Sequence, residues 1–436
     1  MDKNKSMGLW SATSIGVGAM VGAGIFSIFG TATQISGNAV YISFVIAGFI
    51  ALLSTYSYAK LGVTYPSAGG PVEFLVRGFG DGVLTGGLNI LLWTGYIFGL
   101  ALYAKGFSLY AMTFMPAGSA AIWPNIFATA IIVIFTAINF IGSKAVGRSE
   151  IFIVSIKVSI LMLFAVAGMF FINPVNISTS HFPNTPHILF GAGIVFLAYQ
   201  GFGLITNAAE DMDDPEKTLP KALYLSVLIV ICIYVLVSLA VIGNLSISEI
   251  GNYKDYALAA AAQPFLGSIG FKIMAIAALF STSSAINASL YGGANVSYLI
   301  AKDGELPEFF ERKVWKKGTE GLFITSGLVI LCTNFLNLEG IGMLASASLL
   351  VIYVAVNAAH LRLSGETGAK TYLIWTSLFS SLIFFGILTY YEFTNSTKTL
   401  VLFAAVLIFC FIVEWVYRKY SRRSLKTRTL TDEGIL

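Results

Sequence analysis

Long apolar runs recur along the whole chain, and they constrain its fold more than any other feature. Each run holds about 20 mainly apolar residues, enough at 1.5 Å per residue to cross ~30 Å of hydrocarbon. Short polar stretches separate the runs, and of the 436 residues 56% are hydrophobic and only 11% are charged. We therefore expect an all-α membrane protein with twelve transmembrane helices and no separate soluble domain.

The expected spans cover residues 9 to 31, 39 to 61, 83 to 104, 121 to 142, 151 to 172, a sixth from 191, then 222 to 243, 267 to 294, 321 to 337, 341 to 361, 372 to 391 and 398 to 417. The first run is too long for a cleavable signal and lacks a small-residue cleavage site, so we expect the N-terminus to stay in place. Cys232, Cys332 and Cys410 lie in separate apolar runs, where cysteine commonly serves as a small hydrophobe. We expect no disulfide, metal or cofactor.

The distribution of basic residues predicts which loops face the cytoplasm. With the N-terminus inside, most of the 26 Lys and Arg residues fall in cytoplasmic segments, as the positive-inside rule requires. An even number of spans returns the C-terminus to the same side. We therefore expect a multi-pass protein of the inner (plasma) membrane with both termini cytoplasmic. The basic cluster at residues 418 to 428 is expected to anchor this topology, with binding of anionic lipid as the alternative.

Two apolar segments carry more glycine than a spanning helix needs. Four glycines lie between Gly16 and Gly24, and residues 196 to 207 hold two more. Glycine costs roughly 0.5–1 kcal/mol relative to alanine inside a helix, so these clusters predict helices that open and lend peptide groups to a ligand. Close helix packing is the alternative, because Gly18 and Gly22 have the spacing of a small-residue packing motif.

The two glycine-rich spans correspond in position if the single domain, residues 1 to 436, is divided into two five-helix repeats. The first repeat covers residues 9 to 172 and the second 191 to 361, and helices 11 and 12 follow at 372 to 417. Because five is odd, the repeats cross the membrane in opposite senses. An inverted repeat with paired broken helices predicts a transporter with its substrate site at the membrane midplane.

A broken helix exposes amides at one end and carbonyls at the other, and these groups bind opposite charges. Amides of residues 23 to 25 suit a carboxylate, and carbonyls of residues 196 to 199 suit an ammonium, so we expect a zwitterion the size of an amino acid. An aromatic at Phe196 or Tyr199 is expected to close over it, although aromatics at helical spacing more often serve in packing. The expected substrate-binding residues are Val21, Gly22, Ala23, Gly24, Ile25, Phe196, Tyr199 and Gly201.

Lys157 is an ionisable residue inside the expected fifth span. It follows Arg148 by nine residues, so roughly 10–14 Å of helix separates it from the cytoplasmic flank. Ionisable residues within the membrane are costly and usually face the bundle interior, although a lysine can also snorkel back to the interface. Because a low dielectric disfavours a charged amine, its ammonium can lose and regain a proton during a cycle. We predict that Lys157 couples transport to protons.

Four motifs carry a resemblance to a known family: GVGAMVGAGIF at residues 16 to 26, YPSAGG at 65 to 70, GFG at 201 to 203, and DP followed by LPKA at 214 to 222. With them the chain resembles the amino acid, polyamine and organocation transporter superfamily over nearly its whole length. The segments at 142 to 148 and 302 to 315 are similar to those of a proton-dependent member of broad specificity. The resemblance implies the LeuT fold and transport of amino acids.

The resemblance also implies roles for several residues. In sodium-coupled members a cation lies between the first span and hydroxyls of the eighth, and in proton-dependent members a lysine amine takes its place. Lys157 would then contact backbone near Gly18, with Ser283 and Ser284 nearby, and its charge would oppose sodium. Two departures stand out. Gly203 stands where many members carry glutamate, and Gly24 stands where a proton-dependent member has serine.

Together these features predict broad-specificity amino-acid uptake by proton symport, with the amino acid, protons and the lipid bilayer as partners. An amino-acid exchanger or an uncoupled facilitator is the alternative within the transporter class.

A membrane enzyme is disfavoured because the spans hold neither paired aspartates nor a histidine and serine set. A channel is disfavoured because the spans carry no charged pore rings. We expect no nucleic-acid binding, and a monomer or weak homo-oligomer.

Overall fold

The computed structural model describes residues 7–67, 69–116, 118–141, 146–302, 306, 310, 313–315 and 318–421. Ten helical stretches of these residues are long and apolar enough to cross a membrane, and Leu9–Gly22 and Glu320–Phe335 are shorter apolar helices. The turn at 142–145, most of the expected cytoplasmic stretch from 303 to 317, and the basic residues from 422 to 428 lie outside the described residues.

All the expected spans correspond to helices of the described chain. The spans are α1 (Leu9–Ser36), α2 (Val40–Thr64), α4 (Val83–Met112), α5 (Trp123–Ile141), α6 (Val146–Met169), α7 (Thr185–Val195) continued by the 3₁₀ helix η4 (Phe196–Asp211), α8 (Pro215–Asn244), α10 (Ala257–Lys302), α11 (Glu320–Phe335), α12 (Leu338–Arg362), α14 (Thr371–Asn395) and α15 (Thr397–Ser421). The shorter elements are η1 (Gly37–Ala39), α3 (Pro71–Phe79), η3 (Thr179–His181), α9 (Ile247–Asn252), η5 (Lys254–Tyr256), α13 (Ser364–Thr367) and the antiparallel pair β1 (Lys313–Trp315) and β2 (Gly318–Thr319).

Proline and glycine set several helix ends and bends. α3 starts with Pro71 in its first turn, where the missing N–H costs nothing, after Gly70 at φ 48°. The carboxylate of Asp214 accepts a hydrogen bond from the backbone N–H of Lys217 and so caps α8. α10 begins ten residues before the expected span and bends at Gly267, whose φ of 63° is outside the helical range. Local residue chemistry therefore accounts for helix ends and bends that hydropathy does not locate, such as the start of α8 seven residues before the expected span.

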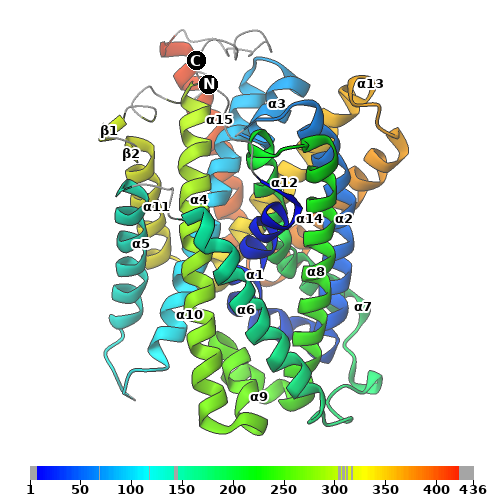
Figure 1. Cartoon of the computed structure of the whole chain (residues 1–436), viewed down its shortest axis with the longest axis vertical. Helices are drawn as coiled ribbons and strands as arrows, with labels where there is room; N and C mark the ends of the chain where they lie inside the picture. Colours follow the sequence, from blue (N-terminus) through cyan, green and yellow to red (C-terminus); the bar gives the residue numbers. More distant parts are fainter. Residues whose placement is uncertain are drawn as a thin grey trace.

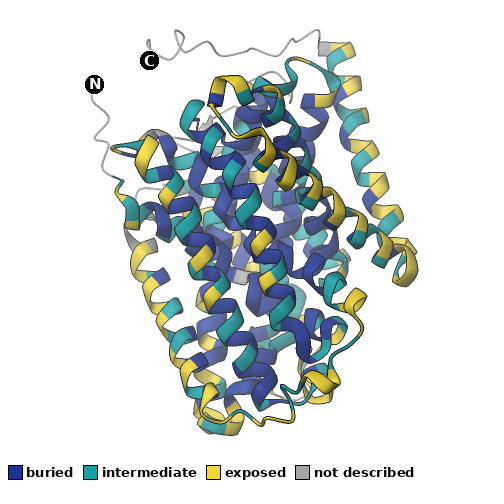
Figure 2. Ribbon diagram, turned by 90° about the vertical axis from the view of Figure 1, so that its right-hand side faces the viewer, coloured by how far each residue is buried: buried dark blue, intermediate teal, exposed yellow. Residues whose placement is uncertain are grey.

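α1 lies in the middle of the bundle and packs against η4, α8 and α10 (Figure 1). Figure 2 shows the buried residues concentrated at the centre and the exposed residues on outward faces and at the ends. Large apolar side chains such as Phe152, Leu163 and Phe280 are exposed on those outward faces. A broad apolar exterior of this kind matches contact with lipid tails rather than with water.

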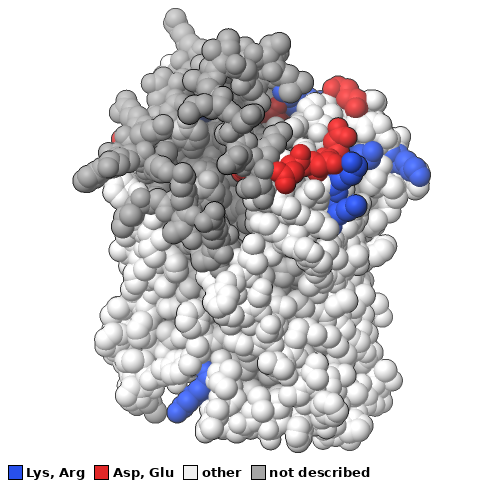
Figure 3. All heavy atoms as spheres, in the orientation of Figure 1, with Lys and Arg blue, Asp and Glu red and all other residues white. Residues whose placement is uncertain are grey.

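The short elements mark the two ends of the bundle. α3 and α13 lie at one end, and α9 lies at the other (Figure 1). In the space-filling view, charged side chains gather mainly at the end that holds α3 and α13, and the wide middle of that face carries none (Figure 3). The separation of charge from the middle is the pattern that a bilayer imposes on a spanning protein.

Candidate functional site

Lys157 of α6 points into the bundle. Its side chain is only 2% exposed, and Nζ donates a hydrogen bond to the carbonyl oxygen of Gly18 in α1, with an N···O distance of 2.7 Å. This is the backbone contact that the family resemblance implies. The geometry rules out a side chain that snorkels to the interface, because the amine is buried against the central helix.

Two further side chains donate to neighbouring carbonyls of α1. The hydroxyl of Tyr234 in α8 lies 2.5 Å from the carbonyl oxygen of Met20, and the hydroxyl of Ser281 in α10 lies 2.9 Å from that of Val21. Both donor residues are fully buried. Together with Lys157, they surround the glycine-rich part of α1 with donors from three helices.

The resemblance implies that Ser283 and Ser284 lie near the amine, and in the structure Ser284 is buried and Ser283 is partly exposed. Ser281 of the same run donates to the carbonyl oxygen of Val21 in α1. Ser281 opens the run of four hydroxyl residues and lies one helical turn before Ser284, so the run itself was the available signal. Nothing in the sequence pointed to a role for Tyr234, because single tyrosines are common in apolar spans.

The expected opening of the first glycine-rich span is absent, since α1 is helical from Leu9–Ser36. Its glycines serve close packing instead. A Cβ at Gly22 would lie 2.3 Å from the Cβ of Ala285, and one at Gly24 would lie 2.5 Å from the Cβ of Ala198. The amides of residues 23 to 25, expected to bind a carboxylate, therefore belong to a continuous helix that is covered by its neighbours.

The second glycine-rich segment is interrupted, but by a change of helix type rather than a gap. α7 becomes 3₁₀ helix at Phe196, and the 3₁₀ geometry continues for 16 residues, far beyond the usual short run. A Cβ at Gly201 would lie 2.6 Å from the backbone nitrogen of Met20, so only glycine allows η4 to touch α1 here. The carbonyl of Ala198 accepts a second contact from Tyr234, at 3.1 Å. Tyr234 therefore bridges the two glycine-rich elements.

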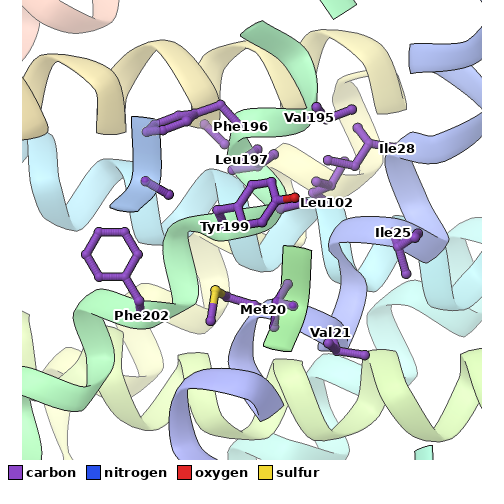
Figure 4. Packing of buried hydrophobic residues seen from close by; sticks show 14 of the residues in the cluster. Met20, Val21, Ile25, Ile28, Leu102, Val195, Phe196, Leu197, Tyr199 and Phe202 are labelled. Atoms are coloured by element: carbon purple, nitrogen blue, oxygen red, sulfur yellow. The ribbon is translucent and has the colours of Figure 1, made fainter. Parts of the chain in front are cut away.

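Most of the residues expected to bind substrate are packed in the core. Val21, Ile25, Phe196 and Tyr199 are completely buried. They share one cluster with Met20, which Figure 4 shows. The expected gating aromatics are both engaged in packing contacts: the hydroxyl of Tyr199 donates to the carbonyl of Phe44 at 2.8 Å, and the ring of Phe196 packs edge-on against Tyr353, 5.4 Å away.

A cavity of about 40 Å³ lies beside η4, on the side that faces α4 and α12. Gly201 is the only expected substrate residue that lines it, and Gly203, where many members of the family carry glutamate, lines it as well. The volume holds a few water molecules and no amino acid. The lining is uncharged, and its polar side chains are Tyr58, Tyr96, Tyr103, Gln200, Ser289 and Tyr353.

Comparison of the sequence with known proteins finds a matching family model and several similar chains. The model of the amino acid permease family matches residues 7–429. An uncharacterized protein of Methanocaldococcus jannaschii, MJ0609, is 46% identical over 97% of both chains. The inner membrane transport protein YbaT of Escherichia coli is 35% identical over 95% of this chain and 97% of its own. The branched-chain amino acid permease BcaP of Bacillus subtilis is 26% identical over 70% of this chain and 68% of its own.

Proposed function

Since the chain belongs to the amino acid permease family, and is therefore a membrane transporter of amino acids rather than an enzyme, we propose that it takes up amino acids of several kinds together with protons. The transport cycle alternates access between the two sides of the membrane. An exchanger or a facilitator without ion coupling is the second candidate, because the same fold and cavity would serve either.

The observation that carries the proposal is the contact between Lys157 and Gly18. An ammonium makes a charge-assisted hydrogen bond to a carbonyl, which is roughly twice as strong as a neutral one. Loss of the proton therefore weakens the link between α6 and α1 and shifts the balance between bundle arrangements. A buried amine at this contact, 2.7 Å from the carbonyl oxygen, thus ties proton binding to the position of the central helix.

The substrate path is proposed to run through the cavity beside η4. At about 40 Å³ the cavity is closed to an amino acid, so the bundle must open to admit one. We assign the motion to the repeats at residues 9 to 172 and 191 to 361, with the helices at 372 to 417 outside them.

The end of the bundle that holds α3 and α13 faces the cytoplasm, with both termini on the cytoplasmic side. A monomer or a weak homo-oligomer suffices, because the Lys157 contact and the cavity lie within one chain.

Uptake of labelled alanine into proteoliposomes, with and without an inward proton gradient, tests the coupling. For each proton carried per substrate, a gradient of one pH unit supports about tenfold accumulation. We expect this response in the wild type and its loss in Lys157→Ala. Gradient-independent uptake by both proteins would contradict the proposal, and counterflow without a gradient would then establish the exchanger or facilitator.

A further inference from the structure

Gln200 of η4 carries a side-chain amide that the described protein leaves unsatisfied. Its Nε2 is buried and has no hydrogen-bond partner, and the residue lines the cavity beside η4. Buried polar atoms without partners are uncommon in folded proteins, because the hydrogen bonds lost from water are not replaced. An unpaired amide in a cavity wall is therefore a position where a bound molecule would supply the missing partner.

The rest of the cavity wall is polar without being charged. Tyr58 of α2, Tyr96 and Tyr103 of α4, and Tyr353 of α12 line it, and no hydrogen bond joins their hydroxyls to other described residues. The rings of Tyr58 and Tyr353 pack on Phe202 of η4, with centroids 5.2 and 5.6 Å away. This packing gives the wall a fixed shape. A charged group entering the cavity would find no opposite charge to offset its desolvation.

Gln200 also stands next to the place where η4 meets α1. It immediately precedes Gly201, whose missing side chain lets η4 approach the backbone nitrogen of Met20. In the proposed function the substrate path runs through the cavity beside this contact, and Gln200 lines that cavity. A substrate held there would extend its side chain along the cavity wall within reach of the Gln200 amide.

We propose that Gln200 binds the side chain of the transported amino acid and favours small substrates with a hydroxyl group, serine and threonine above alanine. This inference rests on the proposed function. A carboxamide has both a hydrogen-bond donor and an acceptor, and a substrate hydroxyl can form a hydrogen bond with either one. The cavity of about 40 Å³ suits a small side chain, and its uncharged wall disfavours lysine and glutamate.

The test compares uptake of labelled serine and alanine into proteoliposomes by the wild type and by Gln200→Leu. We expect serine to be favoured over alanine by about three- to tenfold in kcat/KM in the wild type, the worth of one hydrogen bond, and we expect Gln200→Leu to lose this preference. Gln263→Leu is the matched control, because Gln263 is exposed on α10 and lies outside the cavity. A preference that survives in Gln200→Leu overturns the inference.

A second readout separates binding from folding. Because the amide is unsatisfied when the cavity holds no substrate, Gln200→Met should unfold at the same temperature as the wild type or higher. Serine should then raise the unfolding temperature of the wild type more than alanine does, and should lose this advantage in the variant. Equal shifts by the two amino acids in the wild type would overturn the inference. A wild type that carries no amino acid at all would instead refute the proposed function.

Discussion

The side-chain nitrogen of Lys157 and the carbonyl oxygen of Gly18 lie 2.7 Å apart, although the two residues are 139 positions apart in the sequence. The contact joins α6 to the middle of α1, where Tyr234 and Ser281 also donate to the backbone. The three carbonyls belong to residues of the helix α1, and a carbonyl oxygen has a second lone pair that a side-chain donor can use. The central helix is thereby held from three sides at its glycine-rich segment.

A lysine amine at this contact, protonated when substrate binds in the proposed cycle, predicts uptake that ignores sodium. Two unit charges 4 Å apart repel by about 4 kcal/mol at an effective dielectric constant of 20, enough to exclude a sodium ion from the same place. Alanine uptake by the wild type should therefore be unchanged when choline replaces sodium on both sides of the membrane. A rise in uptake with sodium would show that the amine does not occupy the cation position.

The bridge made by Tyr234 predicts a transport defect in Tyr234→Phe. The substitution keeps the ring and removes the hydroxyl that lies between the carbonyls of Met20 and Ala198. Loss of a buried hydrogen bond is worth about 0.5–1.5 kcal/mol, so we expect maximal uptake to fall by about three- to tenfold with the fold intact. Initial uptake rates and size-exclusion profiles measure the two quantities.

Tyr199→Phe is the matched control for this experiment. Its ring packs against that of Tyr234, with centroids 5.2 Å apart, but its hydroxyl bonds to α2 rather than to α1. We expect a smaller loss of uptake in the control. An equal loss in both variants would mean that any buried tyrosine hydroxyl matters here and that the bridge has no special role.

Close packing at Gly24 predicts that Gly24→Ala destabilises the protein. The added Cβ would lie 2.5 Å from the Cβ of Ala198 and 2.6 Å from its Cα. The backbone of Ala198 cannot move aside as the end of a flexible side chain could. Overpacking a core typically costs 1–3 kcal/mol, so we expect the unfolding temperature in detergent to fall by several degrees. Gly327→Ala is the control, because nothing lies within 4 Å of its added Cβ. An unchanged unfolding temperature in Gly24→Ala would contradict the packing.

A buried polar network at the end of α12 predicts a structural role for His360. Its ring nitrogens lie 2.9 Å from the hydroxyl of Ser57 in α2 and 3.0 Å from that of Thr367 in α13. Replacement in His360→Leu removes both hydrogen bonds, each worth about 0.5–1.5 kcal/mol, while Ser57 keeps its bond to Asn357 and Thr367 its bond to Ser364. We expect a lower unfolding temperature, measured against His187→Leu, because His187 is exposed. Equal unfolding temperatures in the two variants would argue against the network.

The span boundaries could be predicted because hydrophobic length is a local property. α2 was expected at 39 to 61 and runs over Val40–Thr64, and α15 was expected at 398 to 417 and runs over Thr397–Ser421. The interior position of Lys157 followed for a similar reason, since a charge in mid-span costs too much to face lipid. Each inference needs only the residue and its distance from the membrane surface.

The site depended on contacts that no local pattern specifies. A glycine cluster is equally consistent with an opened helix and with a tightly packed one. In α1 the glycines allow close packing against Ala198 and Ala285, which lie far away in the sequence. The same holds for Tyr234, which contacts α1 and η4, and for Gln200, which lines a cavity together with residues of α4 and α12. Hydropathy along the chain is enough to locate the apolar spans and to show that one amine lies within them. Which carbonyls that amine and its neighbours contact follows only from the folded bundle, because hydrogen bonds and close packing depend on side chains brought together from different helices.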